Sequence, residues 1–178
     1  AFGSVEDLKQ KLKDRGAGHF ASGWVWLAAD SDGNVWDFGE DVTNFSYDDL
    51  GVPHIFGENE AAVDFATGFV HARDRLFQME MVVRVVTGRV SEVAGPVALN
   101  SDLFWKKFEF DSLAPLWYAQ LADSMPQITA RMEAYAAGVN AYTARMPFGS
   151  RPLEYHLLGI DPMEWRAENI FYLLRYMS

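Results

Sequence analysis

Four charged side chains lie close together in this sequence and are the first candidates for acid–base chemistry: Arg73, Asp74, Arg75 and Glu80. On a helix, residues four apart share a face, so Asp74 can reach Gln78, whereas the neighbours Arg73 and Asp74 point to different faces. Carboxylates beside guanidinium groups serve either catalysis or a buried ion-pair network. Because no nucleophile adjoins them in the sequence, we interpret this cluster as structural.

No nucleophile is evident from the residues alone. The chain contains no cysteine, which excludes a thiolate nucleophile, disulfides and thiolate metal sites. A serine or threonine nucleophile needs an adjacent general base or a free amino group at residue 1, which here is Ala1. Ser150 follows Gly149 and precedes Arg151-Pro152, a pattern typical of a turn rather than of Gly-x-Ser-x-Gly. We therefore predict no catalytic residue in this chain.

The histidines indicate no metal site. His19, His54, His71 and His156 show no ligand spacing such as His-Glu-x-x-His, so we assign no metal ligand. A site assembled from distant positions is the alternative that spacing leaves open. Glycine-rich phosphate loops are absent as well, so we predict no cofactor-binding residue. We expect His54 and His71 to be packed and hydrogen-bonded.

The composition indicates a folded, acidic protein. Of 178 residues, 49% are hydrophobic and 15% aromatic, which is enough for a sizeable core. The formal net charge of −10 argues against nucleic acid and an anionic membrane surface as partners. No apolar run reaches the roughly 18–20 residues that a membrane-spanning helix needs. The first residues, 1–7, lack an initiator Met and the features of a signal peptide, so we expect a processed, excised or constructed chain.

The N-terminal part is predicted to form a short helix and a β-hairpin. Residues 5–15 carry apolar side chains at helical spacing behind a capping Ser4. Residues 24–28 are aromatic and β-branched and predict a strand. Residues 31–34 are a strong turn signal, and residues 35–38 could form the returning strand.

The rest of the chain is predicted to be mainly helical. A weak strand over 42–47 precedes an extended or turn segment, because Pro53 disfavours helix at the residue before it. Residues 58–93 show a helical pattern, with an interruption expected near Gly68. Within it, a broad buried stripe is expected at 82–86.

Two further helices are predicted near the C-terminal end. One face of a helix over 127–146 carries apolar residues spaced alternately four and three apart: Ile128, Met132, Tyr135, Val139, Tyr142 and Met146. The last helix is expected to begin at Asp161-Pro162, with Glu164 at its third position, and to run to the end without a stop signal, as a truncated helix would. The predicted fold class is α+β, mostly helical: a short helix and hairpin, then a helical body.

Two motifs in this body are specific enough to suggest a family. They are Gly51-Val52-Pro53-His54-Ile55 and Asp74-Arg75-Leu76-Phe77-Gln78-Met79-Glu80, with support from Pro162-x-x-Trp165. Together they resemble the α chain of the penicillin acylases, which are N-terminal nucleophile hydrolases, over roughly residues 42–178. We expect a structural role for the motif residues that we single out: Gly51, Pro53, His54, Asp74, Arg75, Gln78, Glu80 and Trp165.

The resemblance implies one chain of a two-chain amide hydrolase. In that family a precursor cleaves itself, and the β chain then begins with the nucleophilic Ser, whose own α-amino group acts as the base. The substrates are acylated amines, such as penicillins or acyl-homoserine lactones, and the products are a carboxylic acid and an amine. The α chain wraps the β chain with helices. By resemblance the location is periplasmic or secreted, with no nucleic acid or membrane partner.

The same resemblance carries no catalytic residue onto this chain. In the family, the acyl-group pocket is formed mainly by the helix after the Pro-x-x-Trp motif and by the loop beyond it. The residues of that pocket are implied to lie past Ser178, and so is the α-chain ligand of the calcium that several members bind. Alone, the chain is expected to show no turnover.

The first 37 residues do not follow the acylase pattern. Phe20-Ala21-Ser22-Gly23-Trp24-Val25-Trp26-Leu27 is similar to the start of the C-terminal domain of iron/manganese superoxide dismutases, in which the two Trp line the metal site. Val35-Trp36-Asp37-Phe38 lacks the His of that family's ligand segment, so no iron or manganese ligand is carried over. We predict domains 1–41 and 42–178 in a recombined, designed or generated chain. The alternatives to an acylase α chain are a dismutase-like metal module and a chimeric fragment without activity.

Overall fold

The computed structural model describes residues 28–29, 35–36 and 44–177, which are mostly helical and include two small antiparallel sheets. The predicted fold class, α+β and mostly helical, is confirmed. In chain order the elements are β1 (Ala28–Ala29), β2 (Val35–Trp36), β3 (Asn44–Tyr47), β4 (Pro53–Phe56), α2 (Glu60–Val86), α3 (Ser91–Ala94), η1 (Gly95–Ala98), α4 (Leu99–Lys106), α5 (Phe110–Ser124), α6 (Pro126–Arg145), η2 (Phe148–Ser150), α7 (Leu153–Leu158) and α8 (Asn169–Met177).

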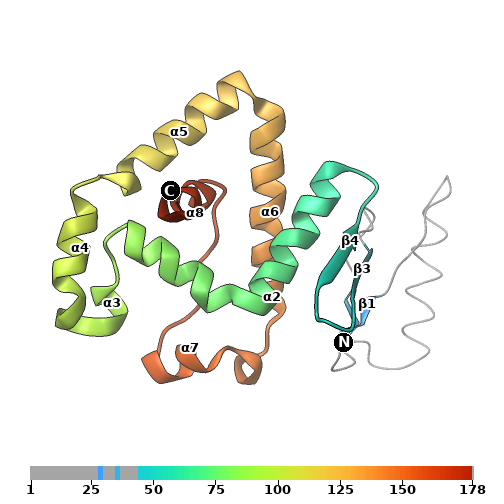
Figure 1. Cartoon of the computed structure of the whole chain (residues 1–178), viewed down its shortest axis with the longest axis horizontal. Coiled ribbons are helices and arrows are strands. Elements are labelled where there is room, and N and C mark those ends of the chain that lie inside the picture. The colour runs from blue at the N-terminus through green and yellow to red at the C-terminus, as the bar shows by residue number, and fades with distance from the viewer. Residues whose placement is uncertain (1–27, 30–34, 37–43, 178) are drawn as a thin grey trace.

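The longer helices form a frame around the last one. In Figure 1, α2, α4, α5 and α6 surround α8, which is seen almost end-on. Helix α8 packs against both α2 and α5. The β3–β4 hairpin lies at the start of α2, on the side away from α8 (Figure 1). The frame therefore fixes where the C-terminal helix sits.

The described residues contain two antiparallel strand pairs, β1–β2 and β3–β4. Strands β1 and β2 pair antiparallel, with Ala28 opposite Trp36, which agrees with the predicted hairpin where it is described. The remaining residues of that hairpin and the predicted helix over 5–15 lie outside the described residues. Strand β3, where a weak strand was expected, pairs antiparallel with β4, which lies in the segment predicted to be extended or a turn; the pairing itself was not predicted. Between them, Asp48 accepts hydrogen bonds from the amides of Leu50 and Val52, both at 2.9 Å.

Helix α2 differs from the expected single pattern over 58–93. It begins after Asn59, whose side chain accepts a hydrogen bond from the Ala62 amide at 2.8 Å. The interruption predicted near Gly68 is wrong, because the non-helical backbone lies at Arg75, with φ −143° and ψ 19°. The predicted end near Val93 is also wrong. The helix stops at Val86, and Gly88 then takes a left-handed φ of 62°.

Gly68 lies within α2, at the point where this helix crosses α6. A Cβ atom on Gly68 would stand 2.1 Å from the Tyr135 carbonyl oxygen, and one on Gly138 would stand 1.9 Å from the Phe65 carbonyl oxygen. Two glycines, one on each helix, therefore let the two backbones approach closely. Helix α6 spans Pro126–Arg145, so the helix predicted over 127–146 is confirmed.

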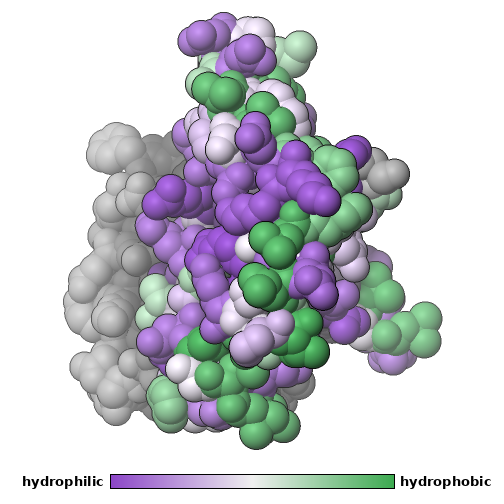
Figure 2. Space-filling model, turned by 90° about the vertical axis from the view of Figure 1, so that its left-hand side faces the viewer, coloured by the Kyte–Doolittle hydropathy of each residue, from purple (hydrophilic) through white to green (hydrophobic). Residues whose placement is uncertain are grey.

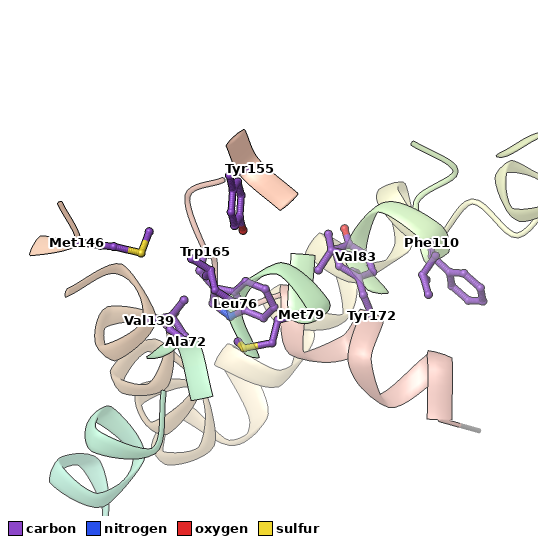
Figure 3. Close-up of a cluster of buried hydrophobic side chains, with 13 residues drawn as sticks. Ala72, Leu76, Met79, Val83, Phe110, Val139, Met146, Tyr155, Trp165 and Tyr172 are labelled. Carbon is purple, nitrogen blue, oxygen red and sulfur yellow. The ribbon is translucent and has the colours of Figure 1, made fainter. Parts of the chain in front are cut away.

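The main core lies between α2 and α6 and extends to α5, α7, α8 and Trp165. Buried side chains from α2, α5, α6, α7 and α8 form one cluster, together with Trp165, which is 2% exposed. Figure 3 shows Trp165 in the middle of this cluster, near Leu76 and Met79 of α2. The buried stripe predicted at 82–86 is present, since Val83 and Val86 are buried.

The predicted start of the last helix is wrong. Residues 161–166 are neither helix nor strand, and α8 begins only at Asn169. Asp161 pairs with Arg151 at 2.6 Å instead of capping a helix, and the amide of Met163 donates to Glu80 at 2.7 Å. Tertiary partners thus override a local capping pattern. Helices α4, α5 and α7 were not predicted, and α5 contains Pro115, which argues against a helix when read locally.

Candidate functional site

The hairpin residues of the first motif shape a turn at the surface. Gly51 adopts a φ of 76°, which favours glycine, and Pro53 opens β4. His54 Nε2 lies 3.2 Å from a carboxylate oxygen of Asp48. His54 is therefore hydrogen-bonded as expected, but it is exposed rather than packed. This arrangement stabilises the turn and offers no nucleophile.

At the kink of α2, the second motif joins the helix to the hairpin. The Tyr47 hydroxyl donates a hydrogen bond to Asp74 at 3.2 Å, and the Arg73 guanidinium lies 4.9 Å above the Tyr47 ring. Burial raises the pKa of Tyr47 to about 12, so the phenol stays a proton donor at neutral pH. Arg75 and Gln78 are exposed. These contacts tie β3 to α2.

The charged cluster expected from the sequence does not form one buried network. Of the four side chains, only Arg73 and Asp74 make an ion pair with each other within the described residues, at 3.9 Å. Arg75 is exposed, and Glu80 is buried. The reason is geometric: Glu80 faces the core, whereas Asp74 faces the hairpin, so the helix separates them.

One acid–base pair links α2 to α6. His71 Nδ1 lies 2.9 Å from the Tyr135 hydroxyl, and the two rings meet edge to face, 5.8 Å apart. His71 is hydrogen-bonded as expected, but it is exposed rather than packed. Partial burial of the ring lowers the pKa of His71, against the opposing charge of Asp74, and burial raises the pKa of Tyr135 to about 12. Both groups are then neutral at neutral pH. The two side chains share a hydrogen bond, and neither provides a nucleophile.

Five Ser and Thr hydroxyl groups of this region are bonded to the backbone. Side chains on α2, α5 and α6 donate hydrogen bonds to main-chain carbonyl oxygens of their own helices: Thr67, Thr87, Ser124, Thr129 and Thr143. Such back-bonding is structural. Among the residues that the structure describes, no group of three or more His, Asp or Glu is placed to hold a metal ion. Nor does any described helix have the length and apolarity needed to cross a membrane.

Two motif residues are tied to the segment that precedes α8: Glu80 bonds to it from α2, and Trp165 belongs to it. Glu80 is 1% exposed and accepts a hydrogen bond from the Met163 amide at 2.7 Å. Burial raises the pKa of Glu80, and the bond from Met163 opposes this shift. Two residues further on, the amide of Trp165 donates to Asn140 at 2.8 Å. Both motif residues thus act on the segment that precedes α8.

A row of aromatic rings crosses α4, α5 and α8, and we call it the aromatic strip. Its consecutive ring centroids lie between 5.3 and 6.2 Å apart. In order, its members are Phe104, Phe108, Phe110, Trp117 and Phe171. Phe104 is 53% exposed and Phe108 40%. Figure 2 views the side of the molecule that carries α3 and α4, where hydrophobic side chains (green) lie among hydrophilic ones (purple). A partly exposed row of large rings is typical of a surface that another protein segment covers.

A family model described as penicillin amidase matches residues 43–178. The chain belongs to the penicillin amidase family. A second model, of the C-terminal domain of iron/manganese superoxide dismutases, matches residues 1–46. Both resemblances noted in the sequence are therefore present in the chain.

Several relatives support this membership in the penicillin amidase family. Penicillin acylase 2 proenzyme from Pseudomonas sp. (strain SE83) is 35% identical over 131 residues, which are 74% of this chain and 16% of that protein. Acyl-homoserine lactone acylase QuiP from Pseudomonas aeruginosa is 34% identical over 130 residues, 71% of this chain and 15% of that protein. Penicillin G acylase from Escherichia coli is 32% identical over 130 residues, 69% of this chain and 14% of that protein. The chain thus spans about a sixth of these relatives' length.

A solved structure shows the same fold. A chain of thermostable penicillin G acylase from Alcaligenes faecalis superposes with a TM-score of 0.67 and 24% identity, over 76% of this chain and 71% of that chain. The helical frame around α8 is therefore the fold of a penicillin amidase family member.

Sequence reasoning missed two features of this amidase-like region. Asn140 was not singled out, although an amide side chain inside a helix is a weak helix former that often marks a specific hydrogen bond. The aromatic strip was missed because its rings lie on three helices, two of which were not predicted. No spacing rule connects residues such as Phe104 and Phe171.

Proposed function

We propose that this chain is the non-nucleophilic α chain, or part of it, of a penicillin-acylase-type amidohydrolase. One observation carries the proposal. The alignment of this chain with a solved acylase chain covers 71% of that chain. The alignment with a related proenzyme covers only 16% of the proenzyme. The solved chain is therefore much shorter than a proenzyme, as expected for one product of a cleaved precursor.

In this proposal the chemistry belongs to a β chain that begins with Ser. The Ser hydroxyl attacks the carbonyl carbon of an acyl amide, and its own α-amino group takes the proton. The amine leaves with that proton, and water then releases the carboxylic acid from the acyl-enzyme. In this proposal the described part of the chain contributes scaffold, and the hydroxyls of Thr67, Thr87, Ser124, Thr129 and Thr143 serve it by donating to helix carbonyl oxygens. Acting alone, it would show no turnover.

The aromatic strip is where we propose that the β chain packs. Flanking apolar side chains extend the exposed area, since Leu103 and Leu116 are 55% and 60% exposed. Such residues would leave water on association, which is the main favourable contribution to protein–protein binding. The substrate class is an acylated amine, such as a penicillin or an acyl-homoserine lactone. Calcium, and a periplasmic or secreted location, belong to the same proposal.

The match over residues 1–46 favours a second candidate, a dismutase-like module in a chimeric chain. Metal analysis of the purified chain decides between them. An iron or manganese content below about a tenth of an equivalent would rule out the metal module. A stoichiometric content would support it.

The coding sequence downstream of residue 178 tests the main proposal. We expect an open reading frame that continues into a segment whose mature first residue is Ser. A stop codon directly after Ser178 would contradict the α-chain assignment and leave a chimeric fragment without activity.

A further inference from the structure

The segment between α7 and α8 has no regular structure, yet it is held at three points. We call residues 161–166 the strap. At its start, Arg151 pairs with Asp161 at 2.6 Å. The amide of Met163 donates to Glu80 on α2 at 2.7 Å. Asn140 on α6 makes two bonds to Trp165: it accepts from the amide at 2.8 Å and donates to the carbonyl oxygen at 2.7 Å.

Packing alone does not explain a buried carboxyl group at Glu80. A buried carboxyl group is disfavoured relative to an apolar side chain of similar size, which would fill the same space. What an apolar side chain cannot do is accept the Met163 N–H. Since buried main-chain donors need partners, the value of Glu80 lies in a directed hydrogen bond.

Asn140 holds the strap at a second residue, Trp165. Its amide satisfies both the N–H and the C=O of Trp165, so it fixes that residue in position and in rotation. The bonded amides belong to alternate residues, Met163 and Trp165, and their partners come from two different helices. The Trp165 ring, 2% exposed, is buried in the core beside them. Four residues beyond Trp165, α8 begins and packs against α2 and α5.

We propose that Glu80 and Asn140 are positioning residues that clamp the strap and so set where α8 begins between α2 and α5. The consequence for catalysis rests on the function proposed above, together with the family resemblance, which implies that the helix after Pro162-x-x-Trp165 leads to the acyl-group pocket. Loosening the clamp would shift that pocket relative to the nucleophile of the β chain. The enzyme would then change its preference among acyl groups rather than lose rate evenly.

Amide hydrogen exchange in the full chain tests the clamp itself. Glu80→Ala and Asn140→Ala remove the bonds, whereas Glu80→Gln keeps an acceptor for Met163. Val83→Ala, a buried truncation on α2 without a bond to the strap, is the matched control. We expect exchange at Met163 and Trp165 to accelerate roughly tenfold or more in the two first variants, relative to amides of α6, and to stay near the parent rate in Glu80→Gln. Equal acceleration in Val83→Ala would overturn the proposal.

Acyl preference tests the consequence. The same variants are placed in a penicillin acylase 2 proenzyme in which residues 43–178 of this chain replace the matching stretch. For two acyl amides of different acyl length, the ratio of kcat/KM should change by roughly tenfold in Asn140→Ala and Glu80→Ala, and should not change in Val83→Ala. A uniform loss with both substrates would contradict the positioning role. If even the unsubstituted graft is processed but hydrolyses nothing, the proposed function fails, while the exchange data still decide the clamp.

Discussion

Glu80 shows how much one side chain can decide at the scale of residues. Its carboxyl group is buried, its pKa is raised by that burial, and its hydrogen bond reaches a segment far along the chain. The motif around Glu80 marked the residue as structural. The sequence could not show the partner, because Met163 and Glu80 meet only where the segment before α8 packs against α2. Long-range pairs of this kind leave no periodic signal.

The raised pKa of Glu80 predicts a pH-dependent contribution to stability. The folded chain binds this proton more tightly than the unfolded chain, so the contribution is fully present below the ordinary Glu pKa of about 4.3 and is lost as pH rises through the folded value. In Glu80→Gln this group no longer titrates. We therefore expect the free energy of unfolding of Glu80→Gln, minus that of the parent chain, to increase as pH rises from about 4 to 7.

Urea unfolding of both chains at several pH values measures this difference, in which the titration of other groups largely cancels. A constant difference, or one that moves the opposite way, would contradict a raised pKa of the buried Glu80. Glu80→Ala should be less stable than Glu80→Gln by about 1–3 kcal/mol, because it leaves the Met163 amide without an acceptor.

Among the elements, the crossing of α2 and α6 organises the fold. Helix α6 was predicted almost to the residue because its apolar positions follow one face. The start of α8 was mispredicted because Asp161 and Met163 have tertiary partners that outweigh a good local capping pattern. Helix α5 was not predicted, and Pro115 inside it disfavours a helix when read locally. Local rules therefore succeed where one helix face decides, and they fail where distant residues do.

The glycine contact predicts a sharp contrast between two substitutions. In Gly138→Ala the new methyl group would meet the Phe65 carbonyl oxygen at 1.9 Å, so α2 and α6 must separate. We expect a loss of at least about 2 kcal/mol in the free energy of unfolding, despite the better helix propensity of Ala. Gly149→Ala, where a Cβ meets nothing within 4 Å, should leave stability nearly unchanged. Equal effects of the two substitutions on thermal unfolding would refute the close crossing.

At the scale of the whole molecule, a penicillin amidase family fold presents a partly exposed aromatic strip. The composition indicated a chain that must bury many rings, but not which rings stay exposed. That distinction depends on how α4, α5 and α8 are arranged.

The strip predicts selective loss of association. Because Phe104 and Phe108 are only partly buried in the chain alone, at 53% and 40% exposed, replacing both with Ser should lower its thermal stability less than truncating a fully buried core residue would. Binding to a β chain should weaken by roughly tenfold or more, measured by titration calorimetry. Leu50→Ser, an equally apolar-to-polar change at an 88% exposed residue of the hairpin, is the control and should bind as the parent does. Unchanged binding of the Phe104 and Phe108 variant would place the partner elsewhere.

Hydrolysis of a chromogenic acyl amide tests whether the nucleophile lies outside this chain. The chain alone should release no chromophore above the buffer rate. A proenzyme carrying residues 43–178 of this chain in place of its own matching stretch should release it, and should lose that activity when the first Ser of the β chain is replaced by Ala. Turnover by the isolated chain, or turnover that survives the Ser replacement, would show that the nucleophile lies in this chain and would contradict the account.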